Sequence, residues 1–199
     1  MTLTGGEPML RPNFTAFLEK CRNLDLSVNV LSNLTLLTNS IVEEMKKNPL
    51  LSVQTSIYSM DSYVHDAITK FQGSWEKTIN AVKELISSGI HLQISCPVIK
   101  QNKNSFLDVI KWGKKNNIPV VTNYSIFASY DHDNLNLSNK LSLKEIEEVF
   151  DQQISDNYMK YIRASAEEKC LLTGDSPICT VCRYYFCISA DSDAYPCAG

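Results

Sequence analysis

Two glycines followed by a carboxylate and a proline stand near the start of this 199-residue chain, as Gly5, Gly6, Glu7 and Pro8. Consecutive glycines let the backbone approach a ligand without a clash from Cβ atoms. The neighbouring carboxylate can accept charge-assisted hydrogen bonds from an ammonium group, and Pro8 restricts the path of the chain out of the turn. The four residues together predict a turn that binds an amino group. A plain strand-to-helix turn is the alternative.

Cysteines provide the second set of residues that could carry chemistry. Five of the seven lie in the last 30 residues: Cys170, Cys179, Cys182, Cys187 and Cys197. In a reducing compartment such a cluster is more often a metal site than a set of disulfides. Thiolates hold zinc as well as iron–sulfur clusters, and composition alone favours neither. His65 has no second ligand at metal spacing, so we expect a solvated or helix-capping histidine.

The elements that must position these residues alternate between strand-like and helix-like segments. Strand-like runs fall at residues 2–4, 26–31, 50–58, 91–99 and 118–124, and helical patterns fall at 41–45, 74–87, 105–115 and from 142 onward. Ser40 and Glu43 have the spacing of a capping box, and so do Ser142 and Glu145. Gly89 suits the end of a helix. Repeated βα units predict an α/β fold with a parallel sheet and right-handed crossovers, in which ligands bind at the carboxyl ends of the strands.

Several segments together resemble the radical S-adenosylmethionine (SAM) enzymes. Thr-Gly-Gly-Glu-Pro, followed by Met-Leu-Arg-Pro, resembles the second-strand motif of that family. Residues 30–37 resemble the end of its third strand, with Leu34 in place of a glycine. Residues 53–69 resemble its fourth strand and the following loop, and residues 73–78 the start of the next helix. The resemblance covers residues 2–125, and it implies a partial (β/α)6 open barrel over residues 1–165 that lacks the first strand.

The resemblance also implies which residues bind SAM. In that family the Gly-Gly-Glu-Pro segment binds the methionyl amino group of SAM, and later strand ends contact its carboxylate and ribose. The corresponding residues here are Gly5, Gly6, Glu7, Ser32, Asn33 and Ser56. Hydroxyls and amides suit such contacts because they can donate or accept hydrogen bonds. Ordinary turn hydrogen bonding is the alternative for Ser32, Asn33 and Ser56.

The cysteine-rich tail, residues 178–197, is similar to the start of the SPASM extension, which carries auxiliary 4Fe–4S clusters in peptide-modifying radical SAM enzymes. That start usually reads Cys, twelve residues, Gly, four residues, Cys. Cys179, Ser192 and Cys197 occupy these positions, with serine in place of the glycine. The resemblance implies a cysteine-rich, SPASM-like region at residues 166–199 in which Cys179 and Cys197 ligate a cluster. It leaves Cys182 and Cys187 as less favoured ligands.

The implied activity is reductive cleavage of SAM by a 4Fe–4S cluster to a 5′-deoxyadenosyl radical, which then abstracts a hydrogen atom. The expected partners are a peptide or protein substrate and an electron donor such as a flavodoxin or ferredoxin.

The family holds its catalytic cluster with Cys-x3-Cys-x2-Cys upstream of Gly-Gly-Glu-Pro, and these 199 residues contain no such motif. Two alternatives therefore stay open. One is a truncated, catalytically incompetent SAM-binding remnant, and the other is an α/β module with a structural zinc site.

Composition argues against several other function classes. The formal net charge is −3 and 21% of the residues are charged, so we expect no nucleic-acid partner. No apolar run approaches the roughly 20 residues that span a bilayer, so we expect no membrane association. The first residues lack the basic and apolar regions of a signal peptide. These features predict a cytoplasmic protein.

Overall fold

A computed structural model describes residues 1–127, 134–153, 186–189 and 191–195 of the chain. The chain forms two compact units, which are described separately. The first unit comprises residues 1–127 and 136–141, and the second comprises residues 128–135 and 142–199. No helix among the described residues is long and apolar enough to cross a membrane.

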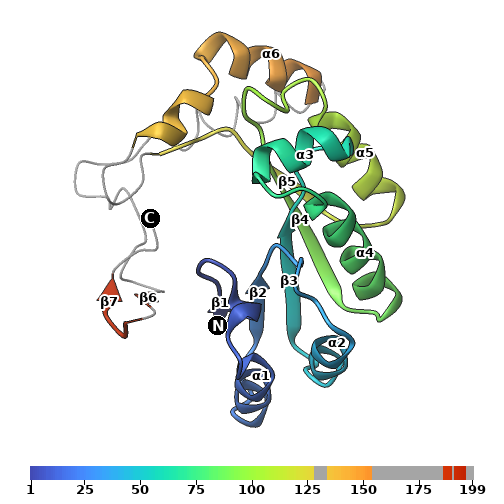
Figure 1. Cartoon of the computed structure of the whole chain (residues 1–199), viewed down its shortest axis with the longest axis vertical. Coiled ribbons are helices and arrows are strands. Elements are labelled where there is room, and N and C mark those ends of the chain that lie inside the picture. The colour runs from blue at the N-terminus through green and yellow to red at the C-terminus, as the bar shows by residue number, and fades with distance from the viewer. Residues whose placement is uncertain (128–133, 154–185, 190, 196–199) are drawn as a thin grey trace, which may run out of the picture. The chain divides into compact units, whose positions relative to one another are not determined.

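The first unit is built on a five-stranded parallel sheet in which the strands lie in the order of the sequence (Figure 1). The strands are β1 (Thr2–Leu3), β2 (Val28–Leu31), β3 (Leu51–Ser56), β4 (His91–Pro97) and β5 (Val120–Asn123). The α-helices between them are α1 (Phe14–Asn23), α2 (Asn39–Lys46), α3 (Ser62–Thr69), α4 (Ser74–Ser87) and α5 (Phe106–Lys115), and the short 3-10 helix η1 spans Pro8–Leu10. The predicted α/β fold with a parallel sheet is confirmed.

Alternating burial along the strands shows which face of the sheet the helices cover. In β3 the buried residues Leu51, Val53 and Thr55 alternate with partly exposed ones. Gly113 of α5 lies directly over β5, because a Cβ atom there would overlap a methyl group of Val120. Leu18, Val42, Val82, Leu85 and Phe106 complete this core from the helices. Each such side chain stabilises the fold by about 1.5–3 kcal/mol through burial.

Helix boundaries agree with the sequence signals in most places. Helix α4 spans the predicted residues, and Gly89 follows it with φ +71°, a conformation that glycine adopts without strain. The predicted capping box at Ser40 is wrong, because α2 begins earlier. Thr38 is the N-cap, and its hydroxyl accepts a hydrogen bond from the Ile41 N–H at 3.4 Å. Its extended backbone places the hydroxyl over the first turn of the helix.

Helix α3 has no counterpart in the sequence prediction, which treated the segment after the fourth strand of the family as a loop. Asp61 caps the helix by accepting a hydrogen bond from the Tyr63 N–H at 2.8 Å. The expectation of a solvated or capping His65 is wrong, because its side chain is 1% exposed and its Nδ1 accepts from the Tyr58 N–H at 3.3 Å. Burial lowers the pKa of His65, and the charge of Asp66 opposes this effect.

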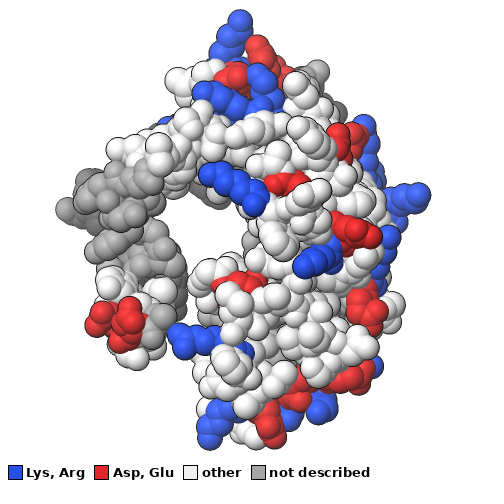
Figure 2. All heavy atoms as spheres, viewed as in Figure 1, with Lys and Arg blue, Asp and Glu red and all other residues white. Residues whose placement is uncertain are grey.

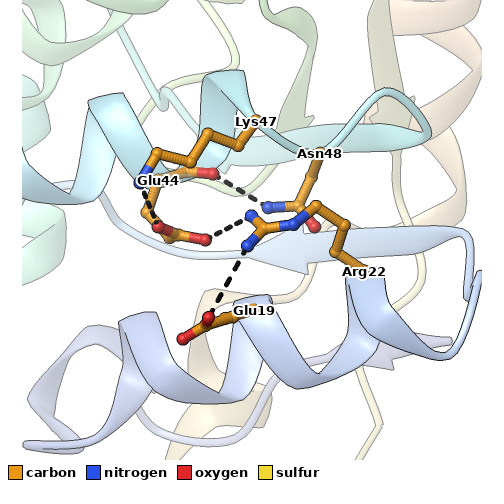
Figure 3. A network of polar contacts seen from close by, with 5 residues as sticks. All are labelled: Glu19, Arg22, Glu44, Lys47 and Asn48. Carbon is orange, nitrogen blue, oxygen red and sulfur yellow. Dashed lines mark hydrogen bonds and ion pairs between the residues drawn. The ribbon is translucent and has the colours of Figure 1, made fainter.

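An ion-pair network joins α1 to α2 (Figure 3). The Arg22 guanidinium of α1 lies 2.6 Å from Glu44 Oε1, and Lys47 lies 3.0 Å from Glu44 Oε2. Asn48 donates to the Glu44 carbonyl at 2.8 Å. Burial raises the pKa of Glu44, but the hydrogen bonds and charges of Lys47 and Arg22 outweigh it, so the net pKa is lowered. The network therefore holds α1 against α2.

The described part of the second unit contains α6 and a small hairpin. Helix α6 (Leu143–Gln153) begins with the predicted capping box: the Ser142 N–H donates to Glu145 Oε2 at 2.9 Å, and the Glu145 N–H donates to Ser142 Oγ at 3.3 Å. Strands β6 (Cys187–Ile188) and β7 (Ala194–Tyr195) pair antiparallel. A second 3-10 helix, η2 (Leu135–Asn139), precedes α6 in the chain, and all of it except Leu135 belongs to the first unit.

Candidate functional site

The carboxyl ends of β1, β2 and β3 bring together most of the residues singled out by the sequence. Leu3 is in register with Val30, and Val30 with Val53, so the three strands end at the same edge of the sheet. The Gly-Gly-Glu turn follows β1, and Ser32 follows β2 directly. This is the edge at which parallel α/β sheets bind their ligands.

Glu7 is tied to the end of the neighbouring strand by its carboxylate. Ser32 Oγ donates to Glu7 Oε1 at 2.8 Å, and the Asn33 N–H donates to Glu7 Oε2 at 2.9 Å. The Met9 N–H adds a third hydrogen bond, to Oε1, at 3.1 Å. Three donors therefore orient both carboxylate oxygens. The structure thus brings together Glu7, Ser32 and Asn33, three of the residues to which the resemblance assigned contacts with SAM.

Ser32 connects Glu7 to the loop that follows β2. Its side chain is buried, with 7% of the residue exposed, and its hydroxyl also accepts a hydrogen bond from the Leu34 N–H at 2.9 Å. Because the Ser32 hydroxyl donates its proton to Glu7, Ser32 orients the carboxylate in this structure. Asn33 orders the next residue, because its Oδ1 accepts from both the N–H and the hydroxyl of Thr35.

Leu34 takes a left-handed backbone conformation, with φ +62°, at the position where the similar family pattern has a glycine. A side chain there costs about 1–2 kcal/mol through contact of Cβ with the backbone. The leucine is only 1% exposed, so burial of its side chain offsets this strain. The chain thus holds a leucine in a backbone conformation that glycine adopts without strain.

Thr78 of α4 is a positioning residue that the sequence did not reveal. It is 2% exposed, and its hydroxyl donates to the Asn33 carbonyl at 2.9 Å. The start of α4 is held in turn by Asp66, whose carboxylate accepts from the Gly73 N–H at 2.6 Å and from the Trp75 N–H at 2.8 Å. Burial raises the pKa of Asp66, and these hydrogen bonds lower it by more. A threonine within an amphipathic helix carries no sequence signal for such a role.

The glycines leave open space beside Glu7. A Cβ atom at Gly5 or Gly6 would meet no described atom within 4 Å, so packing among these residues does not require glycine there. The backbone requires glycine at Gly5, whose φ is +123°. An exposed glycine turn beside an oriented carboxylate leaves room at Glu7 for a hydrogen-bond donor from a ligand.

Ser56 lies at the same edge of the sheet, but its hydrogen bond is to Tyr58 and not to Glu7, Ser32 or Asn33. It is the last residue of β3, is partly exposed, and hydrogen-bonds to the phenol of Tyr58. Burial raises the pKa of Tyr58, and the hydrogen bond from Ser56 opposes this effect. Among the described residues, no hydrogen bond joins Ser56 to Glu7, Ser32 or Asn33.

Two surface hollows lie elsewhere on the first unit. One, of about 370 Å³, is lined by residues of α2, α4 and the loop before α2. The other, of about 510 Å³, lies beside α3 and α4 and includes Asp66 and Trp75. Neither is lined by Gly5, Glu7 or Ser56. The convergence of strand ends and hydrogen-bonding groups identifies the candidate site better than the size of a hollow does.

The expected metal ligands fall mainly outside the described residues, as Cys179, Cys182 and Cys197 do. Cys187 is partly exposed in β6 and forms no disulfide. Within the described ranges, no group of three or more His, Cys, Asp or Glu side chains could hold a metal ion. Ser192 has φ +70°, a backbone conformation that glycine adopts more readily than serine. The similar SPASM pattern has a glycine at this position.

Comparison with curated proteins identifies several relatives, each aligned with about half of the chain. The AdoMet-dependent heme synthase of Nitratidesulfovibrio vulgaris is 30% identical over 108 residues, which cover 54% of this chain and 29% of the relative. The sporulation killing factor maturation protein SkfB of Bacillus subtilis is 30% identical over 111 residues, covering 56% of this chain and 27% of SkfB. The chain therefore spans less than a third of the length of these two relatives.

Solved structures share the fold. Native anSMEcpe with bound AdoMet and the Cp18Cys peptide superposes with a TM-score of 0.70 at 17% identity, covering 99% of this chain and 60% of that one. Streptococcus suis SuiB bound to its precursor peptide SuiA gives a TM-score of 0.59 at 17% identity, covering 83% and 36%. The parallel sheet with its helices is thus part of a radical SAM-type barrel.

The sequence model of the Radical SAM superfamily matches residues 1–113, which is more than half of the chain. The matched range includes the Gly-Gly-Glu turn, the Glu7 network and strands β1 to β4. Proteins of this superfamily use SAM and a 4Fe–4S cluster. By this match and by its fold, the chain belongs to the radical SAM superfamily.

Proposed function

We propose that this chain is the SAM-binding part of a radical SAM enzyme that modifies a peptide or protein. The observation that carries the proposal is the Glu7 carboxylate, oriented by three hydrogen bonds beside two exposed glycines at the carboxyl ends of β1 and β2. Two relatives, SkfB and the subtilosin biosynthesis protein AlbA of Bacillus subtilis, carry names of peptide maturation or biosynthesis. AlbA is 31% identical over 101 residues.

Each residue of the site has a role in this proposal. Glu7 accepts hydrogen bonds from the methionyl ammonium group of SAM, with Gly5 and Gly6 leaving room for that group. Asn33 and Ser56 contact the carboxylate and ribose. Ser32 and Thr78 keep Glu7 and Asn33 in position. When bound, SAM and its 4Fe–4S cluster supply the radical chemistry, and the protein supplies binding and orientation.

The remaining parts of the proposal concern the rest of the molecule. Cys179 and Cys197 hold an auxiliary cluster in a SPASM-like region at residues 166–199, after a barrel that extends to residue 165. A flavodoxin or ferredoxin supplies electrons, and a peptide is the substrate. The protein acts in the cytoplasm, where a reducing environment keeps its cysteines available as thiolates.

The test compares two ligands on one variant. Glu7→Gln should weaken SAM binding by about 10- to 100-fold, because a charge-assisted hydrogen bond contributes about 1.5–3 kcal/mol. Binding of 5′-methylthioadenosine, which lacks the methionyl amino group, should stay unchanged. Equilibrium dialysis with labelled ligands measures both. Glu43→Gln, on the exposed surface of α2, is the matched control.

Two results would contradict the proposal. Unchanged SAM affinity in Glu7→Gln would remove Glu7 from the site. An equal loss for both ligands would show that Glu7 does not act through the amino group.

A further inference from the structure

The sheet of the first unit has one face that its own helices do not cover. Gly113 of α5 contacts Val120, so the Val120 side chain faces the helices. Ile94 is the register partner of Val120, and Thr55 is the register partner of Ile94. These two side chains, and that of Val53 two residues before Thr55, therefore face the helices as well. The side chains between these positions point the other way. Along the strands they are Thr2, Asn29, Leu31, Ser52, Gln54, Ser56, His91, Gln93, Ser95, Pro97, Val121 and Asn123. We call this set the open face.

The open face carries no Asp, Glu, Lys or Arg at these twelve positions, and its one titratable side chain, His91, lies at the start of β4. Charged side chains are instead frequent over the helices of the same unit, as Figure 2 shows. Hydroxyl and amide side chains dominate the open face. A charged ligand group placed at the centre of this face, away from the carboxyl ends of the strands, would lose its hydration without meeting an opposite charge, which is costly.

Gln54 and Gln93 form the centre of this face. They are register partners on adjacent strands, so their side chains lie next to each other. Both are partly buried, and within the described part of the chain neither amide has a hydrogen-bond partner. The row nearer the start of the strands differs, because Ser52 donates to Asn29 Oδ1 at 3.0 Å. The free hydrogen-bonding capacity is therefore concentrated at the two glutamines.

An amide pair of this kind has a definite chemical complement. Each glutamine offers two donors and one carbonyl acceptor, which match the carbonyl and N–H groups of a peptide backbone. Ser56 and Ser95 form the next row toward the carboxyl edge, so the pair is continuous with the proposed SAM site. We propose that Gln54 and Gln93 bind the backbone of an uncharged stretch of the polypeptide substrate. This inference rests on the proposed function and adds the location and the charge preference of its substrate.

Fluorescence anisotropy with three labelled peptide pools tests the inference on the full chain. The neutral pool contains blocked short peptides of Gly, Ala, Ser, Thr, Asn and Gln, and the other two pools carry added Asp or added Lys. We expect the neutral pool to bind most tightly. Gln54→Leu and Gln93→Leu should each weaken its binding about fivefold, the effect of one neutral hydrogen bond. Gln72→Leu, near the start of α4 on the helical side, is the matched control and should bind like the unaltered chain.

A second variant reverses the preference rather than removing it. Gln54→Glu should weaken the neutral pool and strengthen the Lys-containing pool. SAM affinity and melting temperature are measured on every variant and should remain unchanged, so that loss of the peptide site is distinguished from loss of the SAM site or of the fold.

The inference is overturned if the neutral pool binds no better than the charged pools, if Gln72→Leu weakens binding as much as Gln54→Leu, or if no pool binds at about 1 mM. Retained SAM binding with any of these results would leave the proposed function in place.

Discussion

At the scale of single residues, Leu34 combines two effects that oppose each other. Its backbone is left-handed with φ +62°, which disfavours any side chain, while its side chain is buried and favours a large apolar one. Glycine would relieve the first effect and lose the second. The balance between strain and burial at this position shapes the loop that holds Glu7.

Substitutions at Leu34 separate these effects. Leu34→Ala and Leu34→Gly should both destabilise the chain, by about 2–5 kcal/mol, because each removes a buried side chain. Leu34→Gly should be the more stable of the two by about 1 kcal/mol, since alanine keeps the strain. Urea unfolding measures the difference. Leu85 of α4 is the control, because in a regular helix the order should reverse; the same order at both positions would contradict the strained conformation.

The sequence pointed to Glu7, Ser32 and Asn33 through their resemblance to the radical SAM family. The parallel βα order makes the ends of their strands neighbours, and the structure shows hydrogen bonds between these residues. The sequence did not separate residues that face a ligand from one that positions Glu7, since a buried serine and an exposed one look alike in a sequence. Thr78 was missed for the same reason, because its role depends on a long-range contact.

At the scale of elements, α4 positions the loop after β2 through Thr78. Thr78→Val keeps the shape of the side chain and removes its hydrogen bond to Asn33, so it should destabilise the chain by about 1 kcal/mol and weaken SAM binding severalfold. Thr78→Ser retains the hydroxyl and should preserve SAM binding. Calorimetric titration with SAM measures both variants. Equal affinity in Thr78→Val and the unaltered chain would show that α4 does not position the site.

The contact between α1 and α2 has a predictable pH dependence. The folded-state pKa of Glu44 lies below its ordinary value of 4.5, so the ion pair stabilises the fold fully above that pH and ceases to do so as the pH falls through the lowered pKa. Glu44→Gln should lose about 1 kcal/mol of unfolding free energy at pH 7 and nothing below the lowered pKa. Denaturant titrations at several pH values measure this. A pH-independent difference would contradict the role of the charge.

Element boundaries followed the sequence where local signals were strong. The apolar periodicity and Gly89 identified α4, and Ser142 with Glu145 identified the start of α6. The sequence did not predict α3, because the buried residue of this helix is the polar His65 and its sequence has no stripe of buried apolar residues. Ser40 was chosen over Thr38 as a cap because both residue types suit the position and only the backbone conformation distinguishes them.

At the scale of the whole molecule, the tail decides between an iron–sulfur and a zinc site. We expect the anaerobically purified chain to bind iron and acid-labile sulfide, and Cys179→Ala or Cys197→Ala to reduce both. Cys21→Ala, which changes a buried thiol of α1, is the control and should retain them. Metal analysis with a sulfide assay measures the content. Zinc without sulfide would contradict the iron–sulfur assignment and favour the structural zinc alternative.

The central claim is that Glu7 binds the amino group of SAM at the carboxyl ends of β1 and β2. A crystal structure of the chain with SAM tests it most directly. We predict that the methionyl nitrogen lies about 2.7–3.2 Å from a Glu7 carboxylate oxygen, next to Gly5 and Gly6. SAM bound in the hollow between α2 and α4, or at the strand ends with its amino group away from Glu7, would contradict this account.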